Sequence, residues 1–137
     1  MQRGSRIAAI ALLLAACGGS DGGDLRFAAF HPGKPPAELE RGAVLYASYC
    51  ASCHGVHGKG QGLGPPLLDT LFLPARVSDS AMVLAILAGA PQQSWNFGAM
   101  PPVSRVDSVE VPAVVAYVRW LQGEYRATAT GGNSGTP

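Results

Sequence analysis

Charged side chains are scarce in this chain, and no segment gathers basic ones. Asp, Glu, Lys and Arg make up 14% of the 137 residues, and 10 basic against 9 acidic side chains leave a formal net charge of +1. Proteins that bind nucleic acid use clustered Lys and Arg to displace counterions from the phosphates. We therefore expect no nucleic-acid partner, and one small domain at this length.

The chain also lacks the apolar–polar alternation of β-strands, internal repeats, and an apolar run that could cross a bilayer. The apolar run at residues 7–16 is ten residues long, whereas a membrane-spanning helix needs about 20. Because Arg3 and Arg6 precede it, this run is typical of an export signal.

The apolar run ends in Leu14-Ala15-Ala16-Cys17. These residues resemble the lipobox of bacterial lipoproteins, in which the signal peptide is cut before a cysteine that is then acylated. The resemblance implies that residues 1–16 are removed and that Cys17 is lipidated, which would anchor the protein on the periplasmic side of a bacterial membrane. The sequence does not decide whether this is the inner or the outer membrane. An ordinary cleavage site followed by an incidental cysteine is the alternative.

Composition divides the remaining chain into three parts. Residues 17–36 are rich in Gly, Asp and Pro and are expected to form a flexible tether. Residues 127–137 have no periodicity and many turn formers, which predicts a disordered tail. The working domain is therefore expected at residues 37–126.

Apolar residues recur with helical spacing in three segments of this domain, at residues 37–51, 79–88 and 108–122. The segments between them are long, rich in Gly and Pro, and without strand alternation. We therefore predict an all-α fold of three to four helices connected by long loops.

The ends of the second and third predicted helices carry capping residues. Ser78 is placed to cap the second, and Asp107 with Glu110 has the spacing of a capping box for the third. Gly123 is expected to close the third helix. Pro112 conflicts with a regular second turn, so the start of this helix is left open.

Cysteine and histidine are scarcer still, with three of each, yet Cys50, Cys53 and His54 fall within five positions in "CASCH". Cys-x-x-Cys-His is typical of c-type haem attachment, in which the two thiols form thioethers with the porphyrin and the imidazole binds iron. We therefore expect one covalently attached haem c, with His54 as an axial ligand.

Three other interpretations of this motif are weaker. A thioredoxin-like dithiol follows a strand in a βαβ unit, and no such unit is predicted. A structural zinc site needs a second cluster of ligands, which His31 and His57 do not form. A disulfide within the motif would close too short a loop to stabilise a domain.

Most of residues 38–122 resembles class I, mitochondrial-type cytochrome c. Gly42 and Tyr46 precede the first haem cysteine by eight and four residues, where the family has a glycine and an aromatic residue that pack against the C-terminal helix. The resemblance implies that Val114 and Tyr117 meet them, because the missing side chain at Gly42 lets the two helices cross closely.

Further haem contacts follow from the same resemblance. The segment "GPPLL" resembles the family's G-P-x-L, which implies that the Pro65 carbonyl accepts a hydrogen bond from His54 and that Leu67 packs on the porphyrin. Pro66 is an alternative acceptor. Met100, 46 residues after His54 in "FGAMPP", stands in the family's Met-Pro setting and is implied as the second axial ligand.

The remaining methionine, histidine and aromatic residues of the domain and tether are expected to have no chemical role. Met82 lies within a predicted helix, where its neighbours predict core packing. His31 and His57 lie in flexible or Gly-rich segments and are expected to be solvated. The aromatic residues Trp95, Phe97 and Trp120 are expected to shield haem or core.

The expected function is electron transfer by a membrane-tethered cytochrome with His/Met-ligated haem, passing single electrons between respiratory redox complexes. It is not catalysis, because six-coordinate iron has no open position for a substrate. Expected partners are redox proteins that dock mainly on apolar surface, with local charge from Lys59 and Arg105. Two alternatives stay open: a haem subunit of a larger oxidoreductase, and a peroxidase or gas sensor in which Met100 dissociates.

Overall fold

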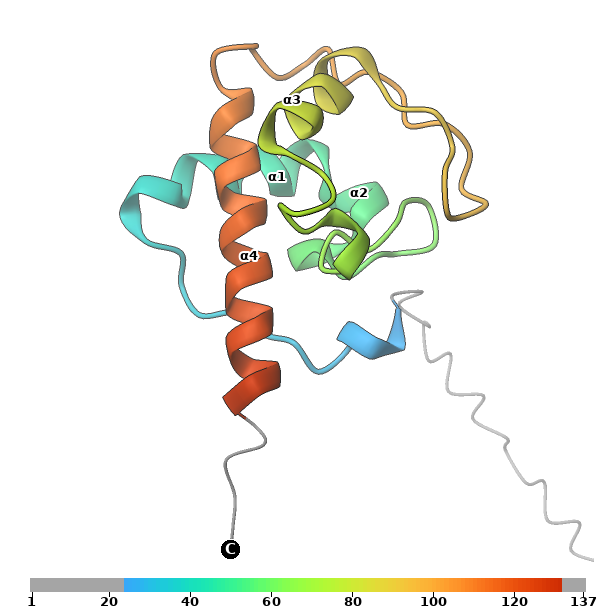
Figure 1. The fold of residues 1–137 in the computed structure, drawn as a ribbon. Helices are drawn as coiled ribbons and strands as arrows, with labels where there is room; N and C mark the ends of the chain where they lie inside the picture. The colour runs from blue at the N-terminus through green and yellow to red at the C-terminus, as the bar shows by residue number, and fades with distance from the viewer. Residues whose placement is uncertain (1–23, 132–137) are drawn as a thin grey trace, which may run out of the picture.

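The computed structural model describes residues 24–131, which form a helical domain without β-strands (Figure 1). The α-helices are α1 (Glu40–Tyr49), α2 (Ala51–His54), α3 (Asp79–Ala88) and α4 (Val111–Gly131). Single 3₁₀ turns lie at Leu25–Phe27, Ala37–Leu39, Val56–Gly58 and Thr70–Phe72. The predicted all-α fold with long loops is confirmed. The predicted signal peptide and Cys17 lie outside the described residues, and no helix within residues 24–131 is long and apolar enough to span a membrane.

Helices α1 and α4 cross in close contact at Gly42. A Cβ atom on Gly42 would lie 2.1 Å from the carbonyl oxygen of Ala113 and 3.0 Å from the Cβ of Tyr117. The rings of Tyr46 and Tyr117 lie 5.5 Å apart beside this point. The expected crossing is therefore present, but Ala113 rather than Val114 lies opposite the glycine. Val114 is buried in the core.

The predicted helix at residues 37–51 is divided into three pieces in the structure. A 3₁₀ turn precedes α1, and the backbone of Cys50 interrupts the helix between α1 and α2. By contrast, α3 has the predicted bounds, and the Ser78 hydroxyl caps it by accepting a hydrogen bond from the Ala81 N–H (3.2 Å). Met82 is buried on α3, as expected.

Helix α4 begins three residues later than predicted, at Val111. Pro112 thus falls in the first turn, where a missing N–H costs no intrahelical hydrogen bond. Asp107 accepts a hydrogen bond from the Val109 N–H (3.1 Å), whereas Glu110 forms an ion pair with Arg41 instead of completing a capping box.

The end of α4 differs more strongly from the prediction. The helix passes through Gly123 and continues to Gly131, so the predicted stop at Gly123 and the predicted disorder of residues 127–131 are both wrong. A glycine within a helix costs about 1 kcal/mol relative to alanine. Packing of Tyr125 in the following turn offsets this cost, because its ring contacts Phe27 and Phe30 (centroids 5.0 and 5.4 Å apart).

The same contacts overturn part of the predicted tether. Phe27 and Phe30 are buried in the core, and Arg26 forms ion pairs with Asp24 (2.6 Å) and with the buried Asp69 (3.0 Å). A flexible tether therefore does not extend through the "LRFAAF" segment, which is folded onto the domain.

Candidate cofactor site

The Cys-x-x-Cys-His motif lies where α1 passes into α2. The Cys50 N–H donates to the Tyr46 carbonyl in the last turn of α1, and the His54 N–H donates to the Cys50 carbonyl in α2 (both 2.9 Å). Cys50 is buried and Cys53 is exposed, and the two form no disulfide. Helix α2 and the cap residue Cys50 before it thus carry two free thiols and an imidazole.

Burial, followed by the charge of Cys53, raises the pKa of the Cys50 thiol to about 11. As a free thiol Cys50 would stay protonated at neutral pH and react slowly as a nucleophile. Cys50 therefore does not supply the low-pKa thiol on which a redox-active dithiol depends.

His54 is held in one tautomer by the loop that follows the motif. Its Nδ1 lies 2.9 Å from the carbonyl oxygen of Pro65. Because a carbonyl can only accept, Nδ1 carries the proton and Nε2 keeps a free lone pair. Pro65, and not Pro66, is the acceptor in the structure. Burial lowers the pKa of His54, against the opposing effect of this hydrogen bond, and so favours the neutral imidazole that a metal needs.

The Gly-rich loop can approach the motif because Gly64 has no side chain. A Cβ atom there would lie 3.1 Å from the Cys53 carbonyl oxygen and 3.2 Å from Nδ1 of His54. The Gly60 N–H also donates to the His54 carbonyl (2.7 Å). The loop therefore supports both the backbone and the ring of His54.

Tyr46 ties α1 to the end of the motif. Its buried hydroxyl donates to the Gly55 carbonyl (2.9 Å), and burial raises the pKa of Tyr46, so the hydroxyl stays protonated.

Tyr46→Phe leaves this carbonyl without its side-chain donor and is expected to lower the free energy of unfolding by about 1–2 kcal/mol. Urea unfolding followed by circular dichroism measures this loss, with Tyr49→Phe, on the exposed side of α1, as the matched control. Equal effects of the two substitutions would contradict a role for the buried bond.

Met100 lies in the loop between α3 and α4, and its backbone is fixed to the end of α3. Met100 and Ala90 exchange two backbone hydrogen bonds (3.0 and 2.8 Å), and the Val103 N–H donates to the Ile86 carbonyl (2.8 Å). The half-buried Met100 side chain packs against the core. These backbone hydrogen bonds thus close the base of the long loop between α3 and α4, and Met100 is one of the residues that form them.

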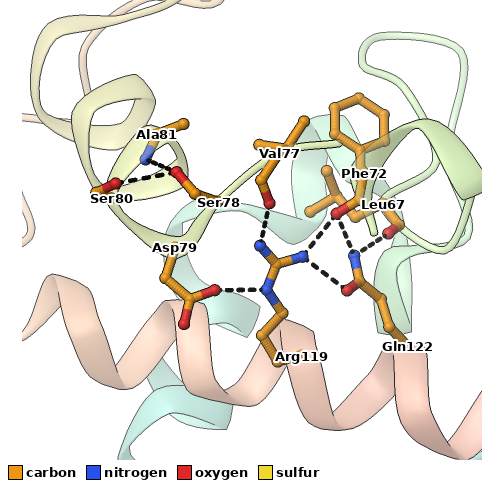
Figure 2. A network of polar contacts seen from close by, with 9 residues as sticks. All are labelled: Leu67, Phe72, Val77, Ser78, Asp79, Ser80, Ala81, Arg119 and Gln122. Carbon is orange, nitrogen blue, oxygen red and sulfur yellow. Dashed lines mark hydrogen bonds and ion pairs between the residues drawn. The ribbon is translucent and has the colours of Figure 1, made fainter. Parts of the chain in front are cut away.

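Leu67 is buried, and its backbone is held by a polar network that sequence reasoning missed (Figure 2). Gln122 of α4 donates to the carbonyls of Leu67 (2.8 Å) and Phe72 (3.2 Å). Arg119, one turn earlier, donates to the carbonyls of Phe72 (2.6 Å) and Val77, to Gln122, and to Asp79 at the start of α3. The sequence feature that could have indicated this network is the pair Arg119 and Gln122, two polar residues three positions apart among the buried positions of an apolar helix.

The remaining candidates divide into exposed and packed residues. His31 is exposed, as expected, but His57 is half-buried, and its buried Nδ1 has no hydrogen-bond partner among residues 24–131. The expectation that His57 is solvated is wrong, because its left-handed backbone (φ 58°) lies in the compact turn after the motif. Burial, then the charges of Lys59 and His31, lowers the pKa of His57.

The three large aromatic side chains pack differently. Trp95 stacks on Phe72 (5.7 Å), Trp120 stacks on Tyr117 (5.7 Å), and Phe97 is 37% exposed.

These donors fit a covalently bound haem. Two free thiols, an adjacent neutral imidazole with a free Nε2 and a thioether on a fixed backbone are the groups that such a cofactor uses. A bare metal ion has no comparable site, because residues 24–131 contain no group of three or more His, Cys, Asp or Glu side chains that could hold one.

Comparison with known families agrees with this chemistry. Residues 39–122, more than half of the chain, match the family described as Cytochrome c. The chain belongs to the cytochrome c family. This cytochrome therefore carries c-type haem bound covalently at Cys50 and Cys53, and its role is that of an electron carrier or of a cytochrome subunit in a complex.

Two relatives are similar over part of their length. The chain is 30% identical over 96 residues to the cbb3-type cytochrome c oxidase subunit CcoP of Rhodobacter capsulatus, a match that covers 66% of this cytochrome and 32% of that subunit. The chain thus spans about a third of that relative. The solved structure of the KustC0563 c-type cytochrome is 28% identical, with a TM-score of 0.45, and the match covers 59% of this chain and 96% of that one.

Proposed function

We propose that this cytochrome is a lipid-anchored electron carrier on the periplasmic side of a bacterial membrane, with haem iron held by His54 and Met100. Its electrons pass singly between respiratory redox complexes. Membership of the cytochrome c family and similarity to an oxidase subunit support haem-based electron transfer. The observation that carries the ligand proposal is the fixed backbone of Met100, paired with Ala90 in the loop that closes on α3.

The two ligands have separate tasks. His54 presents Nε2, because its Nδ1–H is engaged by Pro65. Met100 presents a soft thioether, which favours Fe(II) over Fe(III) and raises the reduction potential relative to other axial ligands. The bound haem supplies one-electron exchange at its iron. His54 and Met100 together would hold the iron and leave a substrate no place to bind it, which favours a carrier over an enzyme.

A haem subunit of a larger oxidoreductase is the second candidate, and the similarity to the CcoP subunit favours it. The two candidates differ in assembly. Purification from native membranes in a mild detergent should yield the carrier free of partners, whereas a subunit should remain in a complex of fixed stoichiometry.

Met100→Ala tests the proposed ligand. We expect the ferric protein to lose the weak long-wavelength absorption band of thioether-ligated haem, to bind cyanide faster than the unaltered protein, and to have a lower reduction potential. The fold should persist, because the Ala90 pairing uses only the backbone of residue 100.

Met82→Leu is the matched control, since Met82 is buried on α3 and its replacement should leave the band unchanged. A band that survives in Met100→Ala would contradict the assignment. An unaltered protein that lacks the band and binds cyanide rapidly would instead support the peroxidase or gas-sensor alternative.

A further inference from the structure

The segment Asp24–Phe30, here called the clasp, is fixed to the domain by apolar and polar contacts. Phe27 and Phe30 pack edge-on against Tyr125 near the end of α4. The clasp backbone is bonded at both ends of its first turn, because the Asp24 N–H donates to the Lys59 carbonyl (3.3 Å) and the Lys59 ammonium donates to the Ala28 carbonyl (3.2 Å).

Charge pairing adds to these contacts. The carboxylate of Asp69 is 8% exposed and has the guanidinium of Arg26 at 3.0 Å. Removing Arg26 from the domain would leave this buried carboxylate without its cation. The clasp therefore belongs to the folded domain, and Asp24 is a fixed point on its surface.

This fixed point limits the reach of an anchor at Cys17. Seven peptide units separate Cys17 from Asp24, and a fully extended chain spans at most about 3.6 Å per residue. The lipid-bearing residue thus lies within about 25 Å of Asp24, however the intervening chain runs. The domain cannot swing as it could on the longer tether expected from composition.

Exposed apolar side chains surround the place where the chain leaves the domain. Asp24 lines a hollow of about 200 Å³ together with the Gly-rich loop at residues 60–64 and with Trp95 and Phe97. Leu25 is 87% exposed and Leu63 is 67% exposed. Asp24 and Arg26 form an ion pair here, and the Lys59 ammonium donates to the Ala28 carbonyl.

We propose that Leu25, Leu63 and Phe97 form a rim that rests on the lipid surface, so that the clasp fixes which side of the domain faces the membrane. This inference rests on the proposed lipid anchor. A few exposed apolar side chains bind a bilayer weakly by themselves, but a short link to an anchor makes their contact intramolecular and raises its effective concentration. Figure 1 shows α3 at the end of the domain opposite the clasp, so α3 would face away from the membrane.

Photolabelling of the full-length, lipidated holoprotein tests this orientation. The protein is bound to vesicles of phosphatidylethanolamine and phosphatidylglycerol that contain a photoactivatable lipid, and labelled peptides are mapped by mass spectrometry. We expect the peptides with Leu25 and Leu63 to be labelled at least about fivefold more than the peptide with Leu84, because an intramolecular contact is strongly favoured over random collision. Leu84 is the internal control, since it is 62% exposed on α3. Equal labelling of the three peptides would overturn the proposal.

A longer link provides a variant that leaves the folded domain untouched. Insertion of a Gly-Ser segment of about 20 residues after Gly23 should reduce the preference for the rim by at least about threefold, because effective concentration falls with linker length. Unchanged preference would show that the short link does not set the orientation, and would overturn that part of the inference.

Two separate measurements test the lipid anchor itself. The intact mass of the mature protein reports acylation of Cys17, and flotation with vesicles reports membrane binding. A protein of unmodified mass that does not float would refute the lipid anchor of the proposed function. A floating protein without rim labelling would refute the orientation alone.

Discussion

Gly42→Ala is expected to lower the free energy of unfolding of the holoprotein by about 3 kcal/mol. This is the upper end of the usual cost of adding atoms to a well-packed core. For a domain of this size that loss lowers the melting temperature by roughly 12–24 °C. The new Cβ would lie 2.1 Å from the carbonyl oxygen and 2.8 Å from the carbonyl carbon of Ala113. These are backbone atoms of α4, so relief requires the two helices to separate rather than one side chain to turn away.

Gly123→Ala is the matched control for this prediction. Gly123 also lies within α4, but no atom of the described part of the chain lies within 4 Å of a Cβ at this position. Alanine there should stabilise the protein by up to about 1 kcal/mol through its higher helix propensity. Thermal and urea unfolding by circular dichroism should therefore give opposite signs for the two substitutions. If both stabilise, the close crossing of α1 and α4 does not limit the stability of the fold.

The sequence predicted those parts of the site whose chemistry is local. The motif at residues 50–54 is recognisable because covalent attachment and axial ligation need two thiols and an imidazole within one helical turn. Gly42 was identified only through the resemblance to cytochrome c, and the structure gives the reason: a Cβ there would meet the backbone of Ala113. The same resemblance implied Pro65 as the carbonyl partner of His54 and left Pro66 open, and the structure has Pro65 in that contact.

Contacts between distant segments could not be predicted in this way. Phe27 and Tyr125 are almost a hundred residues apart, and each lies in a segment whose Gly, Asp or Thr content is typical of flexible chain. Only their mutual packing makes the clasp ordered and lets α4 continue past Gly123. Composition indicates only the local conformational preference of a segment, and here the burial of aromatic surface outweighs that preference.

Arg119 is a second position at which long-range contact decides the role. Its side chain is 14% exposed, whereas that of its ionic partner Asp79 is 70% exposed. The guanidinium also donates to the backbone carbonyls of Phe72 and Val77 (Figure 2). Arg119 therefore holds the segment between the Gly-rich loop and α3 against α4.

Arg119→Met is accordingly expected to lower the free energy of unfolding by about 3 kcal/mol, because charged hydrogen bonds to buried carbonyls contribute about 1.5–3 kcal/mol each when partners are lost. Asp79→Asn removes only an exposed ion pair and should cost less than about 1 kcal/mol. Arg119→Lys keeps the charge but cannot bond Asp79 and both carbonyls at once, so it should fall between the two. Urea unfolding of the three holoproteins measures this order. An Asp79→Asn variant as unstable as Arg119→Met would mean that the ion pair, and not the carbonyl contacts, fixes α4 to the segment that carries Leu67.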